Sequence, residues 1–138
     1  MRPLVFVDTS AWLALVNKSD IFHLKAKEIR DNLLKNKVQF VVTDYIIVEI
    51  ANCLSRIPFR STAVQLNNLI KNSEEIEIIL IDGEVYNEAW ELYSKHQDKE
   101  WGFTDCTSFV VMKQKGIKQA FTTDHHFEQV GFTILLKD

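Results

Sequence analysis

Short apolar runs alternate along this chain with longer stretches in which apolar residues recur every three or four positions. The runs at residues 3–7, 39–43, 76–81, 119–123 and 132–136 are typical of buried strands. Strands that alternate with helices imply crossover connections and a parallel sheet covered on both faces. We therefore expect an α/β fold: a three-layer α/β/α sandwich with a central, mainly parallel five-stranded sheet.

The helices are predicted between these runs. They fall at about 10–16, 22–36, 44–57, 60–72, 85–96 and 104–115, with a short helical turn before the last strand. Ser10 is expected to cap the helix at 10–16, and Thr104 the helix at 104–115. Pro58 is expected to end the helix that starts at residue 44, and Gly116 the helix that starts at residue 104.

Length and composition are those of one globular domain. The chain has 138 residues, 46% of them hydrophobic, with only four Gly and two Pro, so we expect a single domain over residues 1–138 without a linker. No apolar run approaches the ~20 residues of a membrane span. The apolar N-terminus contains Asp8 and no convincing cleavage site, so we expect no signal peptide and a cytoplasmic protein. Cys53 and Cys106 are expected to be buried free thiols because no CxxC pattern occurs.

Two acidic residues fall at the carboxyl ends of predicted strands. Asp8 follows the first strand and Asp124 follows the fourth, and open parallel sheets form their sites beyond these ends. Asp105 begins the helix that leads into the fourth strand, on its apolar side. Glu49 borders the apolar side of the helix that starts at residue 44. All four carboxylates are therefore expected at one edge of the sheet.

Each acid alone also has an ordinary structural explanation. An Asp after a strand is often a turn former, and an Asp in a first helical turn complements the helix dipole. Together, several like charges within a few ångströms cannot all stay ionised without help. A hard divalent cation such as Mg²⁺ or Mn²⁺ prefers oxygen ligands and resolves this conflict.

Four motifs carry a resemblance to a known family. They are VDTSAW (7–12), TDYIIVEIANCL (43–54), WGFTDCTSFVVM (101–112) and FTTDHHF (121–127). In order and spacing, over essentially the whole chain, the sequence resembles the PIN-domain family and in particular VapC-like toxin ribonucleases. The resemblance implies Mg²⁺- or Mn²⁺-dependent cleavage of RNA to a 5′-phosphate and a 3′-hydroxyl.

The resemblance also implies roles for particular residues. The acidic cluster would be Asp8, Glu49, Asp105 and Asp124, with Asp8 and Asp105 as the firmest metal ligands. The family also carries hydroxyl side chains beside these acids, and in this sequence they correspond to Thr9, Ser10 and Thr104. A further acid found in some relatives corresponds to Asp98.

Partners follow from the same resemblance. It implies a small antitoxin that inserts a segment into the acidic groove, and a homodimer. Helices near 22–36 and 44–72 have enough apolar and aromatic surface to build such interfaces. The formal net charge of −3 argues against a protein that coats nucleic acid by charge alone. The side chains that could attract RNA by their positive charge are Lys95, Lys99, Lys113 and Lys115. They are equally well explained as solubilising charges.

Three alternatives remain beside this interpretation. A phosphatase of the haloacid dehalogenase type would need a second Asp at position 10, which is Ser10. A zinc site at His125 and His126 lacks supporting Cys or His residues, so we expect these histidines at the surface. A PIN-like module that binds RNA or protein without cutting it is the third alternative.

Overall fold

A single parallel sheet forms the centre of the computed structural model, which describes residues 2–137. Its strands are β1 (Leu4–Val7), β2 (Gln39–Thr43), β3 (Ile76–Ile79), β4 (Gln119–Phe121) and β5 (Thr133–Ile134). They lie in the order β3-β2-β1-β4-β5, and every neighbouring pair is parallel. The predicted α/β fold with a five-stranded sheet is confirmed.

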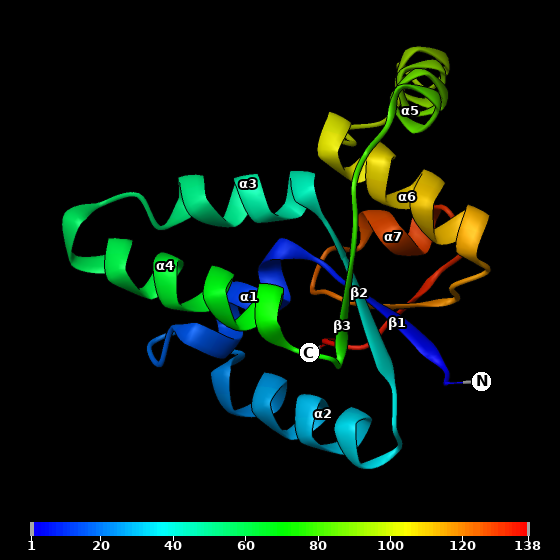
Figure 1. Ribbon diagram of the computed structural model, residues 1–138. Helices are drawn as coiled ribbons and strands as arrows, with labels where there is room; N and C mark the ends of the chain where they lie inside the picture. The colour runs from blue at the N-terminus through cyan, green and yellow to red at the C-terminus, as the bar shows by residue number, and fades with distance from the viewer. Residues whose placement is uncertain (1, 138) are drawn as a thin grey trace.

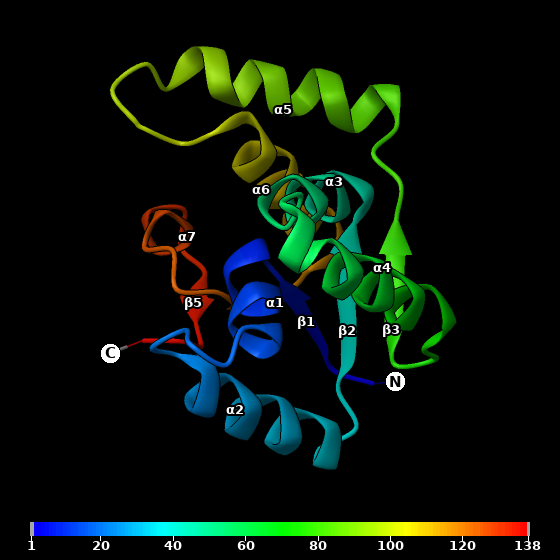
Figure 2. The ribbon, with the colours of Figure 1, turned by 90° about the vertical axis from the view of Figure 1, so that its left-hand side faces the viewer.

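Helices cover both faces of this sheet. They are α1 (Thr9–Val16), α2 (His23–Lys35), α3 (Asp44–Cys53), α4 (Ile57–Asn72), α5 (Gly83–Lys95), α6 (Phe103–Lys115) and α7 (His126–Gln129). In Figure 1, α1 to α4 lie on the left of the sheet and α6 and α7 on its right. Figures 1 and 2 both place α5 beyond the carboxyl ends of the strands. Within residues 2–137, no helix is long and apolar enough to cross a membrane.

The register of the three central strands brings three polar residues together. Leu4 pairs with Gln39, and Phe6 pairs with Ala120. Continued past the end of β1, this register sets Asp8 between Thr43 on one side and Thr122 on the other. The Asp8 amide extends the ladder by donating to the Phe121 carbonyl at 3.1 Å. The fold therefore directs the first predicted acid to the middle of the sheet's carboxyl edge.

Aromatic side chains fix α6 and α7 against the sheet. Phe6 of β1, Phe109 of α6 and Phe127 of α7 are each at most 2% exposed. The ring of Phe127 lies 5.0 Å from that of Phe109 and 6.3 Å from that of Phe6, measured between centroids. Complete burial of a Phe side chain contributes roughly 1.5–3 kcal/mol. This packing anchors the helix that carries Asp105.

Some predicted boundaries are wrong. Pro58 lies in the first turn of α4 instead of ending α3, because the first turn needs no amide from proline. Asp8, not Ser10, is the N-cap residue of α1, without a side-chain cap bond. The last three strands are two to four residues long, shorter than the apolar runs that contain them.

The two cysteines differ in burial. Cys106 is buried, as expected, but Cys53 is exposed, so the prediction for Cys53 is wrong. The buried positions near α3 recur every four residues, at Ile46, Ile50 and Leu54. Cys53 falls beside this stripe at the last residue of the helix.

The N-cap of α3 gives a test of the fold. Thr43 is fully buried and accepts a hydrogen bond from the Ile46 amide at 3.1 Å. Thr43→Val keeps the shape but leaves that amide unpaired, so we expect a loss of about 0.5–2 kcal/mol in the free energy of unfolding. Urea denaturation measures it. The control is Thr133→Val at an exposed position of β5; equal stability of the two variants would contradict this account of the cap.

Candidate functional site

Asp8 is almost completely withdrawn from water. It is 5% exposed and follows the last residue of β1. The Thr122 hydroxyl donates to Asp8 Oδ2 at 2.8 Å. The Ser10 hydroxyl lies 3.5 Å from the same oxygen and 3.0 Å from the Thr122 hydroxyl. A buried carboxylate needs such partners; here the two hydroxyls and the Thr9 backbone supply them.

Glu49 approaches from α3. Its Oε1 accepts a short hydrogen bond from the hydroxyl of Thr9, the first residue of α1. The side chain is half-buried. The Thr9 hydroxyl of the VDTSAW motif therefore holds an acid that lies 40 residues later in the chain. The next hydroxyl of the motif, that of Ser10, lies close to Asp8.

Asp105 lies in the first turn of α6. Its Oδ2 accepts a hydrogen bond from the Gly102 amide at 3.0 Å, which closes the start of the helix. Gly102, not Thr104, is the N-cap residue, so the predicted cap is wrong. An acid at this position also complements the helix dipole. Only one oxygen takes part in the cap, which leaves Oδ1 free for other ligands.

Asp124 is held by the loop that follows β4. Its amide donates to the Thr122 hydroxyl at 3.0 Å, and its Oδ1 accepts from the His126 amide at 2.9 Å. His126 Nδ1 lies 3.1 Å from Asp124 Oδ1 and 3.9 Å from Asp105 Oδ2. A protonated His126 would therefore bridge two acids.

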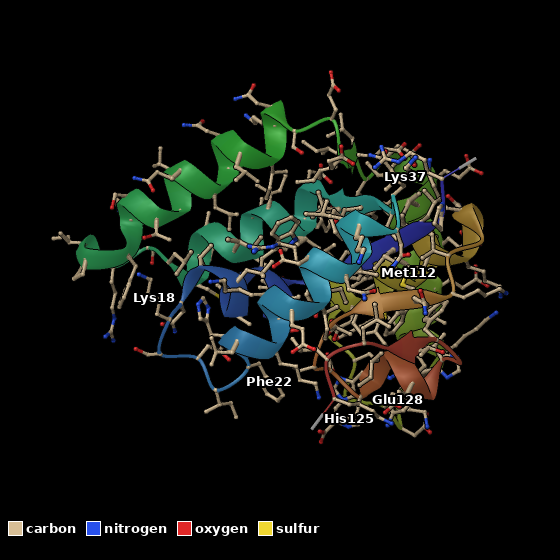
Figure 3. The ribbon with its side chains drawn as sticks, turned by 90° about the horizontal axis from the view of Figure 1, so that it is seen from below. Lys18, Phe22, Lys37, Met112, His125 and Glu128 are labelled. Carbon is tan, nitrogen blue, oxygen red and sulfur yellow. The ribbon has the colours of Figure 1, made fainter. Side chains whose placement is uncertain are left out.

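The two histidines occupy different environments. The side chain of His125 is 70% exposed and that of His126 only 20%, so the predicted surface position is wrong for His126. Figure 3 shows His125 at the margin of the molecule, whereas Met112 lies inside it. His126 is turned inward because it begins α7, where the next residue, Phe127, is fully buried.

Burial and like charges raise the pKa of two carboxyl groups. Burial, with the charges of Asp105 and Glu49, raises the pKa of Asp8 from 3.8 to about 7, although the Thr122 hydrogen bond opposes the shift. Burial also raises the pKa of Asp105 to about 6 against the Gly102 hydrogen bond, with further contributions from Asp124 and Glu49. The four predicted acids are thus electrostatic neighbours. Within residues 2–137, no Lys or Arg forms an ion pair with any of them.

Two other predicted residues do not join this cluster through their side chains. Asp98 is 72% exposed and pairs with Lys99. Thr104 contributes its carbonyl, which accepts from the hydroxyls of Thr107 and Ser108 inside α6.

Sequence reasoning missed Thr122 and misplaced His126. Thr122 is fully buried and connects Asp8 with the Asp124 backbone. The signal available in the sequence was its place as the first polar residue after a buried strand, but that pattern alone also describes many loop residues.

Two groups of side chains that could hold a cation share Asp124. In one, Asp124 with His125 and His126, the ligand atoms lie within 4.8 Å of one another; it is the only such group of three or more among residues 2–137. No three of the four carboxylates meet that distance among these residues. They are linked through the electrostatic coupling of Asp8 with Asp105 and Glu49, and of Asp105 with Asp124.

Comparison with known proteins identifies the family. The family model described as "PIN domain" matches residues 5–133. The chain belongs to the PIN-domain family. This confirms the resemblance found in the four sequence motifs.

Curated relatives of this PIN domain include one named "23S rRNA-specific endonuclease VapC20", from Mycobacterium tuberculosis. It is 34% identical over 130 residues, which cover 94% of this chain and 95% of the relative. A crystal structure of Mycobacterium tuberculosis VapC20, described as a sarcin–ricin loop cleaving toxin, matches with a TM-score of 0.85 and 32% identity. The match covers 94% of this chain and 96% of that one.

A more distant structure supports the PIN fold alone. VapBC2 from Rickettsia felis, bound to a DNA fragment from its promoter, matches with a TM-score of 0.72 at 12% identity. That match covers 96% of this chain and 97% of the other.

The raised pKa of Asp8 gives a test of the buried charge. Between pH values near the ordinary pKa of 3.8 and the raised value of about 7, the folded PIN domain keeps a proton that the unfolded chain has lost. The free energy of unfolding should therefore fall as pH rises through this window. Asp8→Asn removes the effect. In EDTA near pH 8 we expect the variant to be more stable than wild type by up to about 4 kcal/mol, from ~1.4 kcal/mol per pKa unit.

Urea denaturation at several pH values measures this difference. The advantage of the variant should shrink towards pH 4. Asp31→Asn, which changes an acid that is 67% exposed on α2, is the matched control and should show no such dependence. A variant that is less stable than wild type near pH 8 would show that the buried charge of Asp8 does not destabilise the fold.

Proposed function

We propose that this PIN domain is a metal-dependent endoribonuclease and the toxin of a toxin–antitoxin pair. The observation that carries the proposal is the cluster of Asp8, Glu49, Asp105 and Asp124 around a buried carboxyl, without a Lys or Arg partner among residues 2–137. The 34% identity to a 23S rRNA-specific endonuclease supports it.

The donor set fits Mg²⁺ or Mn²⁺. Carboxylate oxygens are the ligands that these hard cations prefer, and both keep waters in a site of few protein ligands. Asp8 and Asp105 would be the main ligands, with Asp124 and Glu49 completing the site directly or through water. The raised pKa values of Asp8 and Asp105 support this assignment because a cation relieves the repulsion that causes part of each shift.

Each side chain has a role in phosphodiester hydrolysis. A bound divalent cation supplies charge stabilisation for the phosphoryl oxygens and a more acidic water. A carboxylate that reaches the cation only through water, Glu49 or Asp124, would take the proton from that water. Thr9 orients Glu49, and Thr122 orients Asp8. His126, beside Asp124, would donate to a phosphate oxygen.

The proposed substrate is the sarcin–ricin loop of 23S rRNA, by analogy with the relative described above. With this substrate, the proposed location of the activity is the cytoplasm. Proteins that recognise RNA by sequence mostly bind unpaired loop bases. Of the candidate cations, Lys95, Lys99 and Lys115 are each already paired with an acid. Lys113 is exposed and is the freest to attract RNA.

Two exposed apolar surfaces fit two protein partners. On α5, outside the helices expected from the sequence to form interfaces, Tyr86 is 44% and Trp90 51% exposed. We assign this surface to a second copy of the chain. Its ring-rich centre resembles homodimer interfaces. On α4, Ile57 is 89% and Val64 56% exposed, and we assign this surface to the antitoxin.

Cleavage of a defined RNA tests the enzyme. We expect the protein with Mg²⁺ or Mn²⁺ to cut a hairpin that carries the sarcin–ricin loop, and EDTA to stop it. Asp8→Asn and Asp105→Asn should each lower kcat/KM by at least about 100-fold, because each removes a carboxylate that would hold the cation that stabilises the charge on the phosphoryl oxygens. Asp31→Asn should retain full activity. RNA binding without cutting by wild type would favour a non-catalytic module instead.

Sedimentation tests the proposed dimer. We expect a dimer at micromolar concentration, and Trp90→Glu should convert it to monomer because it buries a charge in the interface. Val64→Glu introduces the same charge on the α4 surface and should leave the dimer intact. A monomeric wild type, or dissociation by Val64→Glu alone, would contradict the assignment.

A further inference from the structure

A recess opens at the end of α5. It has a volume of about 490 Å³, within the range of ~300–1,000 Å³ typical of ligand pockets. The end of α5 and the segment that leads to α6 line it, from Tyr93 to Gly102; we call it the 93–102 pocket. Gly102 also belongs to the site, because its amide donates to Asp105 Oδ2. A group in the pocket would therefore lie next to the proposed metal ligands.

Aromatic rings form one side of this pocket. His96 and Trp101 have ring centroids 4.9 Å apart. The Trp101 indole N–H donates to Gln129 Oε1 at 2.8 Å, which fixes this ring at 7% exposure. Tyr93 is 42% exposed. One face of its ring is stacked on Trp90, with centroids 5.3 Å apart, so Tyr93 borders the α5 surface assigned to the second copy, and its other face can be covered by a base. A planar base is stabilised by stacking on such a ring, whichever base it is.

A carboxylate without a partner supplies the polar edge. Glu100 lines the pocket and is exposed. Within residues 2–137, no side-chain hydrogen bond or ion pair engages its carboxylate; the nearby Lys99 pairs with Asp98 instead, at 3.4 Å. A carboxylate accepts two adjacent donors. Among the four RNA bases, guanine offers such a pair, N1–H and the N2 amino group, on its Watson–Crick edge.

We propose that the 93–102 pocket holds an unpaired guanine of the RNA, adjacent to the bond that is cut. The base would stack on Tyr93 and present its Watson–Crick edge to Glu100. This inference deepens the proposed function and rests on it: the acid cluster cuts, and the pocket selects where. It assigns the choice of base to Glu100 and the stacking of the base to Tyr93. The acid cluster itself supplies neither.

Cleavage of hairpins with each of the four bases on either side of the cut tests the pocket. Wild type should prefer guanine at one of these positions by at least about tenfold in kcat/KM, as for a good bidentate contact. Glu100→Gln should reduce that preference to less than about threefold, mainly through KM. Tyr93→Ala should lower kcat/KM about tenfold for every base, and Tyr93→Phe should restore it.

Glu84→Gln is the matched control. It removes the same charge from the exposed first turn of α5, about 14 Å along the helix from Tyr93 at the edge of the pocket, and should not alter base preference. Sedimentation of each variant separates an effect on RNA from one on assembly.

Binding measured without cleavage separates this inference from the proposed function. The same hairpins are titrated by fluorescence anisotropy into Asp8→Asn, with and without Glu100→Gln. A guanine preference in binding that Glu100→Gln removes would support the pocket even if no RNA is cut. Cleavage by wild type with a base preference unchanged in Glu100→Gln would overturn the pocket and leave the nuclease intact. So would a Glu100→Gln effect confined to binding of the antitoxin.

Discussion

Asp8 carries the constraint on which the rest of the site depends: a carboxyl group in the middle of a buried sheet edge, with other carboxyl groups around it. Burial and the charges of Asp105 and Glu49 raise its pKa to about 7. Hydroxyl partners from Thr122 and Ser10 reduce the cost of this position but provide no positive charge. The fold therefore holds negative charges together that would separate in a flexible chain.

The local structure around Asp8 follows from the parallel sheet. Its central strand ends at Val7, and the neighbouring strand β4 ends at Phe121, so the next residues of both strands meet. Helix α6 then brings its first turn to the same edge, anchored by Phe109 in the core. The acid of that turn, Asp105, both closes the helix and faces the cluster. One set of packing contacts thus stabilises the domain and positions the chemistry.

Most of the fold could be predicted from the chain. The alternation of apolar runs and helical stripes was enough to predict a parallel five-stranded sheet, because strands buried on both faces are continuously apolar. Strand order was not predictable, since it depends on which crossovers reverse direction. Pro58 misled the prediction because proline suits a first helical turn as well as the end of a preceding helix.

The site could be predicted only in part. Asp8 and Asp124 were found because strand ends meet at one edge, and Glu49 and Asp105 because acids on apolar helix faces are unusual. Thr122 and His126 could not be found this way, since their roles depend on the turn between β4 and α7. The pocket beside Gly102 depends on how the segment after α5 folds back, which no periodicity in the sequence describes.

The central claim is that the acid cluster exists to bind a divalent cation. Isothermal titration calorimetry with Mn²⁺, in buffers of different ionisation enthalpy, tests it most directly because it counts the protons that binding displaces. With pKa values of about 7 for Asp8 and about 6 for Asp105, the account predicts binding with proton release near pH 6 and almost none near pH 8.5. It also predicts much weaker binding by Asp8→Asn. Binding that releases no proton at either pH and is unchanged in Asp8→Asn would contradict it.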